Sequence, residues 1–105
     1  MRVTLFHNHY NDSHLDEVKQ EMKRRGAPRI RAIWSEMYGE WMAVEGCHRL
    51  RAAADLGLAP EIVDISNQKS VTIQSDGENT RFKVSDLAAE LQDEMPRKQS
   101  FRFGG

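Results

Sequence analysis

One short stretch of the chain has the residue types and spacing that phosphate chemistry needs. It contains, in order, Gly46, Cys47, His48 and Arg49, with Arg51 two positions later. An apolar stretch ends before it and a helix-favouring stretch begins with it, so a strand is expected to turn into a helix here. The first N–H groups of a helix lack partners within it, and the helix dipole adds about half a positive charge there. A glycine and arginines at such a turn predict a phosphate-binding site.

This stretch allows more than one assignment of roles. In the phosphate-binding interpretation, the N–H groups of Cys47 and His48 meet phosphate oxygens, Arg49 clamps them, and His48 adds a pH-sensitive donor. Glu45, just before the glycine, is then a candidate ligand for a magnesium ion. A second interpretation makes Cys47 a reactive thiol, because a helix N-terminus and neighbouring cations favour the thiolate. Cys47 and Glu45 are thus the candidate catalytic residues, and in a third interpretation the arginines simply face solvent.

Length and composition limit the kind of protein that carries this stretch. A chain of 105 residues predicts one domain. Its 15 basic and 16 acidic residues give a net charge of −1, which argues against tight sequence-independent binding to nucleic acid but leaves room for a local basic patch. The single cysteine excludes an intramolecular disulfide. We find no apolar run of signal-peptide or membrane-helix length, and expect a soluble, cytoplasmic protein with no membrane partner.

Apolar periodicity predicts the elements that position the stretch. They are, in chain order, a short strand around residues 3–7, a helix at 13–25, strands at 29–34 and 41–45, a helix at 47–56, a strand at 62–65, strands at 71–74 and 81–84, and a third helix that ends before Pro96. Asp76 and Gly77 predict a tight hairpin turn, and Ser85 and Asp86 predict the N-cap of the third helix.

This order of elements predicts an α+β fold with a small mixed sheet and two or three packed helices. Residues 1–96 are expected to form that single domain. Residues 97–105 show no periodicity and are expected to be a flexible tail, although Phe101 and Phe103 could dock on the domain or on a partner.

Other chemistry-bearing residues have a simple explanation beside the functional one. His7 and His9, with His14, carry donors that zinc accepts, although histidines two apart on a strand are common by chance, and no metal site is assigned. Trp34 and Trp41 flank a hairpin turn and are expected to pack together. The cations at residues 23–25 suit the end of a helix dipole and would also suit a nucleic-acid backbone.

Residues 15–65 resemble the ParB/sulfiredoxin superfamily. The resemblance lies in the order helix, glycine, proline, hydrophobic strand, turn and second strand, followed by GCHRLRAAADLGL at residues 46–58 and then APEIVDI. It covers about half of the chain, and residues 46–53 are its most specific part. The resemblance implies a ParB/sulfiredoxin-like fold and a nucleoside triphosphate, ATP or CTP with Mg²⁺, bound at residues 46–51.

The two branches of this superfamily imply different roles for Cys47. We call residues 46–53 the 46–53 box. In ParB-like proteins this box is usually GERRxRAA and binds the nucleotide, and Cys47 stands where those proteins have glutamate. In sulfiredoxins the box is GCHR, as here, and it binds ATP while its cysteine reduces an over-oxidised peroxiredoxin cysteine. We expect a stand-alone ParB-like domain that binds a nucleotide, with hydrolysis left open. The alternatives are a sulfiredoxin-type reductase and a ParB-like DNA-binding or nuclease module, each compatible with a protein partner or a homodimer.

Overall fold

The computed structural model describes residues 1–5, 10–75 and 77–104 of the chain. Its elements are β1 Arg2–Leu5, α1 Asp12–Arg25, β2 Arg29–Ser35, β3 Glu40–Ala43, α2 Cys47–Leu56, β4 Glu61–Asp64, β5 Ser70–Ser75, β6 Glu78–Lys83, α3 Val84–Glu94, the 3₁₀ turn η1 Met95–Arg97, and β7 Ser100–Arg102. The predicted helix at 47–56 is confirmed, and most other predicted boundaries lie within two residues of those observed. His7, His9 and Asp76 lie outside the described residues.

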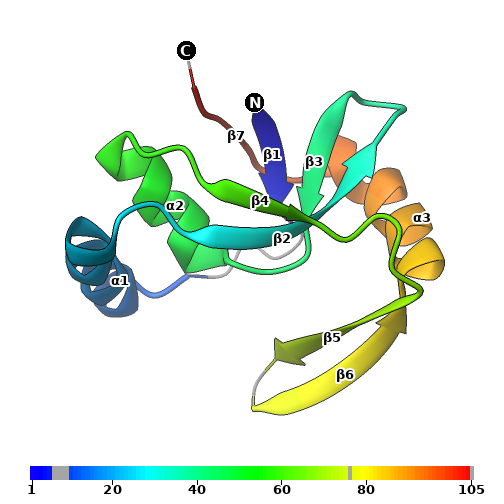
Figure 1. Ribbon diagram of the computed structural model, residues 1–105, viewed down its shortest axis with the longest axis horizontal. Coiled ribbons are helices and arrows are strands. Elements are labelled where there is room, and N and C mark those ends of the chain that lie inside the picture. Colours follow the sequence, from blue (N-terminus) through cyan, green and yellow to red (C-terminus); the bar gives the residue numbers. More distant parts are fainter. Residues whose placement is uncertain (6–9, 76, 105) are drawn as a thin grey trace.

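Five strands form one mixed sheet in the order β4-β2-β3-β1-β7. β2 pairs antiparallel with β3 in the predicted hairpin, whereas β1 with β3 and β2 with β4 run parallel. β5 and β6 form a separate hairpin that projects away from this sheet (Figure 1). α1 and α2 lie side by side at one end of the molecule and α3 lies at the other (Figure 1). The predicted α+β class, with a mixed sheet and three helices, is confirmed.

The central strands of the main sheet, β1, β2 and β3, contribute buried side chains, which fall into two core clusters. Side chains alternate along a strand, and on β2 this sends Ile30 toward α1 and α2 while Ile33 packs with the α3 side. The α1–α2 cluster also contains Leu5 and Leu50, which are almost completely buried. The other cluster joins α3 and the β5–β6 hairpin to the sheet, with Leu87 among its members. The two clusters thus hold α1 and α2 against one face of the sheet and α3 against the other.

Two helix starts illustrate how local sequence sets the ends of elements. Asn11 caps α1, because its side chain accepts a hydrogen bond from the His14 N–H at 3.2 Å. The prediction that Ser85 and Asp86 cap α3 is wrong, since this helix already begins at Val84. The Val84 N–H bonds the Lys69 carbonyl at 3.0 Å, so β6 runs directly into the helix and no side-chain cap is used.

The C-terminal segment is part of the fold as far as Phe103, which corrects the domain end expected at residue 96 and the flexible tail expected to begin at residue 97. β7 pairs antiparallel with β1 and completes the sheet at that edge. The N-terminal ammonium group of Met1 donates to the Phe103 carbonyl at 2.9 Å, and the Phe103 side chain is 7% exposed. A three-residue strand is too short to show a periodicity, so the sequence pattern does not reveal it. Within the described ranges, no helix is both long and apolar enough to cross a membrane.

Candidate functional site

A cavity of about 560 Å³ lies in front of the N-terminus of α2. α1, β2, the turn before α2 and the β5–β6 hairpin all contribute to its wall. Its lining residues are His14, Val18, Arg31, Glu45, Gly46, Cys47, His48, Arg49, Thr72, Gln74 and Asn79. The structure therefore brings together four of the five predicted phosphate-binding residues and Glu45.

Position 46, just before α2, requires a glycine. Its φ of 88° lies in the left-handed region that side chains disfavour, and a Cβ atom there would stand 2.6 Å from the Ile30 Cδ1 atom. The Gly46 carbonyl accepts the first hydrogen bond of the helix, from Leu50, at 2.8 Å. No acidic residue occupies the first turn of α2, so no carboxylate of the helix itself cancels the positive end of its dipole.

Glu45 is held by Arg31 through two charge-assisted hydrogen bonds. Arg31 Nη2 lies 2.7 Å from Glu45 Oε1, and Arg31 Nε lies 2.8 Å from Oε2. Hydrogen bonding from Arg31 lowers the pKa of Glu45, with the Arg31 and Arg49 charges adding to the effect and burial opposing it. The same pairing raises the pKa of Arg31. Glu45 is therefore an anion whose two oxygens are both engaged, and its charge is cancelled within the cavity.

Arg31 also joins the β5–β6 hairpin to the site. Its Nη1 donates to the Thr72 carbonyl at 3.0 Å. One guanidinium group thus connects β2, the residue before the Gly46 turn, and the hairpin that forms the far wall of the cavity. The sequence placed Arg31 on a strand but gave no signal that it would meet Glu45 or the hairpin, because those partners are 14 and 41 residues away.

Arg49 lies at the rim of the cavity with its orientation set by two partners. Its Nη1 donates to the Arg29 carbonyl at 2.9 Å, and its Nη2 lies 3.6 Å from Glu45 Oε2. An arginine has five N–H donors, so these two contacts orient the guanidinium group and leave donors for a ligand. Its side chain is 40% exposed, as a group that meets an entering anion needs to be.

His48 connects the N-termini of α1 and α2. Its Nε2 accepts the Asn11 backbone N–H at 3.0 Å, so neutral His48 carries its proton on Nδ1. The His14 ring lies edge-on at 4.4 Å between centroids. Burial, followed by the charges of His14 and Arg51, lowers the pKa of His48. His48 is therefore neutral at pH 7, and Nδ1 is the atom through which it would donate to an anion.

Cys47 and Arg51 occupy different environments although both were predicted at the site. Cys47 begins α2, is half-buried, packs against the core and lines the cavity. Arg51 does not line it: its Nη2 donates to Gln99 Oε1 at 2.7 Å, and its guanidinium lies 4.0 Å from the Tyr10 ring centroid. A step of two residues along a helix rotates the side-chain direction by about 200°. Arg51 therefore points away from the side of Arg49 and toward the C-terminal segment.

The hairpin residues were not predicted for this site. Thr72, Gln74 and Asn79 line the cavity, and the local sequence of a hairpin does not indicate which distant element it will face. Among the described residues, no group of three or more His, Cys, Asp or Glu side chains could hold a metal ion.

Comparisons with known proteins leave the superfamily resemblance as a prediction. A scan against protein-family models found no match, and searches of curated proteins and of solved structures found none. The resemblance therefore depends on the residues of the 46–53 box and on the order of the neighbouring elements.

Proposed function

We propose that this chain binds the phosphate groups of a nucleotide in the cavity in front of α2, as a domain of the ParB/sulfiredoxin type. The observation that carries the proposal is the position of the Gly46 turn and the start of α2 in the wall of a cavity of about 560 Å³. That volume lies within the range of about 300–1,000 Å³ found for small-molecule sites.

The chemistry of the turn supports an anion with several oxygen acceptors. The backbone N–H groups at the start of α2 belong to Cys47 and His48, and no acidic residue in the first turn of the helix opposes an anion there. Arg49 supplies a planar group that can donate two parallel hydrogen bonds to one phosphate. The pairing of Glu45 with Arg31 removes the repulsion that a lone carboxylate would exert on the ligand.

Glu45 does not fit the role of a magnesium ligand. Both of its oxygens accept hydrogen bonds from Arg31, and it is the one carboxylate among the described residues that line the cavity. We therefore assign no step to a magnesium ion held by this chain.

Sulfiredoxin-type thiol chemistry is the second candidate, because Cys47 lines the same cavity. The two candidates share the phosphate site and differ in what they require of the sulfur. A serine at position 47 keeps the backbone N–H groups and the side-chain size, so it separates binding from thiol chemistry.

Isothermal titration calorimetry tests the proposal with ATP, CTP, GTP and ADP, each with and without magnesium. We expect saturable binding by the wild-type chain and by Cys47→Ser. Arg49→Ala should bind about 10- to 100-fold more weakly, because a hydrogen bond to a charged group contributes about 1.5–3 kcal/mol.

Arg51→Ala is the matched control, since it removes the same group one half-turn away and outside the cavity. It should bind as the wild type does, with circular dichroism confirming that each variant is folded. Absence of binding at millimolar nucleotide, or equal losses in Arg49→Ala and Arg51→Ala, would contradict the proposal. Tighter binding of a DNA duplex than of any nucleotide would favour the nucleic-acid alternative.

A further inference from the structure

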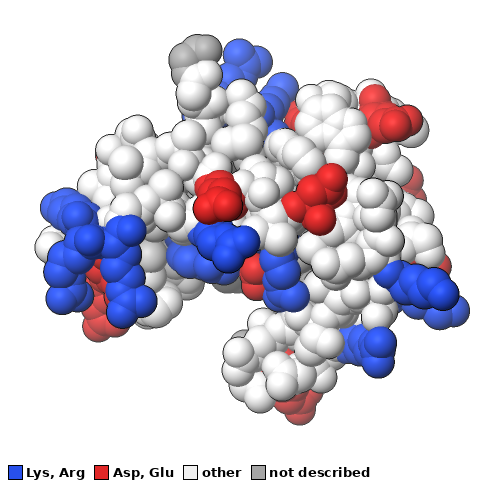
Figure 2. All heavy atoms as spheres, in the orientation of Figure 1, with Lys and Arg blue, Asp and Glu red and all other residues white. Residues whose placement is uncertain are grey.

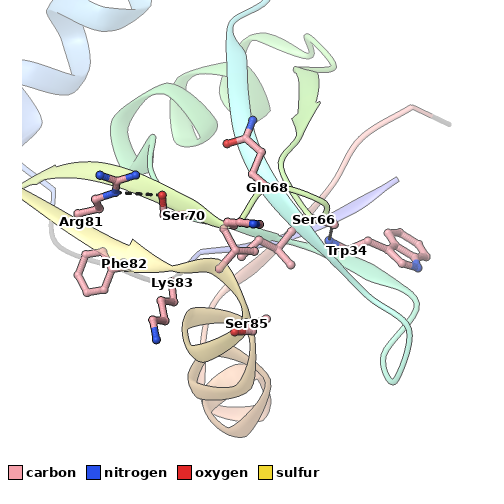
Figure 3. Close-up of a pocket in the computed structure, with 12 residues that line it drawn as sticks. Trp34, Ser66, Gln68, Ser70, Arg81, Phe82, Lys83 and Ser85 are labelled. Atoms are coloured by element: carbon pink, nitrogen blue, oxygen red, sulfur yellow. Dashed lines mark hydrogen bonds between the residues drawn. The ribbon is translucent and has the colours of Figure 1, made fainter.

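A second and larger hollow, of about 880 Å³, lies between the base of the β5–β6 hairpin, the first turn of α3 and the end of β2 (Figure 3). It shares no lining residue with the cavity in front of α2. We call it the hairpin groove. Its lining residues are Ile33, Trp34, Ser66, Gln68, Lys69, Ser70, Arg81, Phe82, Lys83, Val84, Ser85 and Ala88.

The floor of the hairpin groove is apolar. Ile33 and Val84 are 3% exposed, and the half-buried Phe82 and Ala88 pack against the same core cluster. Trp34, which is 41% exposed, also lines the groove, but its ring is turned away from Phe82 (Figure 3). An apolar floor of this kind is suited to bury a hydrophobic side chain of a partner.

The rim of the groove is basic. It carries Lys69, Arg81 and Lys83, all exposed, and no Asp or Glu is among the described residues that line it. Arg81 Nε donates to Ser70 Oγ at 3.0 Å, which orients its guanidinium group at the rim (Figure 3). Figure 2 shows basic side chains beside the junction of the hairpin with α3. Because the whole chain has a net charge of −1, this excess of positive charge is a local feature.

The backbone beside the groove is already hydrogen-bonded. β4 ends opposite Ala32, and beyond that point the Trp34 N–H bonds Ser66 Oγ at 2.9 Å. A partner therefore does not gain a free strand edge at this part of β2, and recognition depends on side chains. An apolar anchor on the floor, with carboxylates facing the rim, is the arrangement that complements both features.

A peptide fits these features better than single-stranded nucleic acid does. Bases need open aromatic faces on which to stack. The Trp34 ring already packs edge-on against Trp41 with centroids 5.0 Å apart, and the Phe82 ring is half-buried. The remaining apolar lining is aliphatic.

We propose that the hairpin groove binds an acidic peptide segment of a partner protein, with a large hydrophobic residue on its floor and Asp or Glu side chains against Lys69, Arg81 and Lys83. This proposal uses none of the residues of the phosphate site, so either one can fail without the other.

A selection from a random 12-residue peptide display library on the folded chain provides the probe. The recovered peptides should contain Leu, Ile, Phe or Trp flanked by at least two Asp or Glu residues. Synthetic, fluorescently labelled copies are then titrated by fluorescence anisotropy against the wild type and two charge-matched variants. Lys69→Glu with Lys83→Glu reverses two rim charges, and Lys23→Glu with Arg24→Glu makes the same change of charge on α1.

The rim variant should bind at least 10-fold more weakly, whereas the α1 variant should change affinity by less than twofold. Affinity should also fall between 50 and 500 mM salt, because exposed ion pairs are screened. If circular dichroism indicates that the rim variant is unfolded, Lys69→Gln with Lys83→Gln replaces it, with a loss of at least threefold expected. Phe82→Ala, checked for folding by circular dichroism, should weaken binding through the floor without altering the salt dependence.

Three results would overturn the proposal. The first is a selection that yields no enriched peptide, or only peptides without acidic residues. The second is an equal loss of affinity in the rim and α1 variants, which would indicate a general charge effect. The third is a 12-nucleotide oligothymidylate that binds more tightly than the best peptide and loses affinity in the rim variant, which would assign the groove to single-stranded nucleic acid.

Discussion

The pairing of Glu45 with Arg31 should contribute measurably to the stability of the fold. Arg31→Ala removes the main hydrogen-bond donor of the Glu45 carboxylate, whose side chain is 25% exposed. It also removes the hydrogen bond to the Thr72 carbonyl of the hairpin. Fully exposed ion pairs contribute about 0.2–1 kcal/mol, and removing one partner of a fully buried pair costs about 3–5 kcal/mol. For side chains that are 25% and 32% exposed, we expect a loss of about 2 kcal/mol for Arg31→Ala, or roughly 8 °C in Tm.

A double-mutant cycle separates the pair from its surroundings. Arg31→Ala, Glu45→Gln and the double variant are compared with the wild type by urea unfolding at pH 7. The two bonds at 2.7 and 2.8 Å should give a coupling free energy of about 1–2 kcal/mol.

The same pair predicts a pH dependence of definite sign. The folded-state pKa of Glu45 lies below its ordinary value of 4.5, so the unfolded chain binds the proton more tightly. The contribution of the carboxylate is therefore complete above pH 4.5 and is lost as the pH falls through the folded pKa. The stability difference between wild type and Glu45→Gln should shrink as the pH falls below 4.5. A coupling below about 0.3 kcal/mol, within the usual error of additivity, would refute the reasoning, as would a difference that does not change with pH.

Three further predictions follow from particular contacts. Gly46→Ala should destabilise the fold by about 2–4 kcal/mol, because φ is 88° and the added Cβ meets Ile30 at 2.6 Å; a loss below 1 kcal/mol in thermal unfolding would contradict this. Phe103→Ala should cost about 3 kcal/mol because the side chain is 7% exposed, whereas a flexible tail would give no change in urea unfolding. The pKa of His48, measured by NMR, should lie below 6.5, and a midpoint at or above 6.5 would refute this prediction. Protonation of His48 then disfavours the folded state, so the wild type should lose stability as the pH falls from 6.5 to the folded pKa, and His48→Gln should lose less.

Local chemistry made much of the fold predictable from the chain itself. The bounds of α2 follow from two glycines on either side of a helix-favouring segment, and the amphipathic stripe of Leu15 and Met22 places α1. The β2–β3 hairpin follows from alternation on each side of a turn. These signals lie within about ten residues of the element they define, which is why a pattern along the sequence contains them.

The sequence by itself determined the α+β class, the strand-to-helix turn at Gly46 and the presence of Cys47, His48 and Arg49 at the start of α2. Only the tertiary structure decided that Arg31 would neutralise Glu45 and that the hairpin would close the cavity. The tertiary structure also placed Arg51 against the C-terminal segment and gave that segment an edge of the sheet. The physical reason is that these outcomes depend on which surfaces pack together, and packing joins residues that are tens of positions apart and carry no common local pattern.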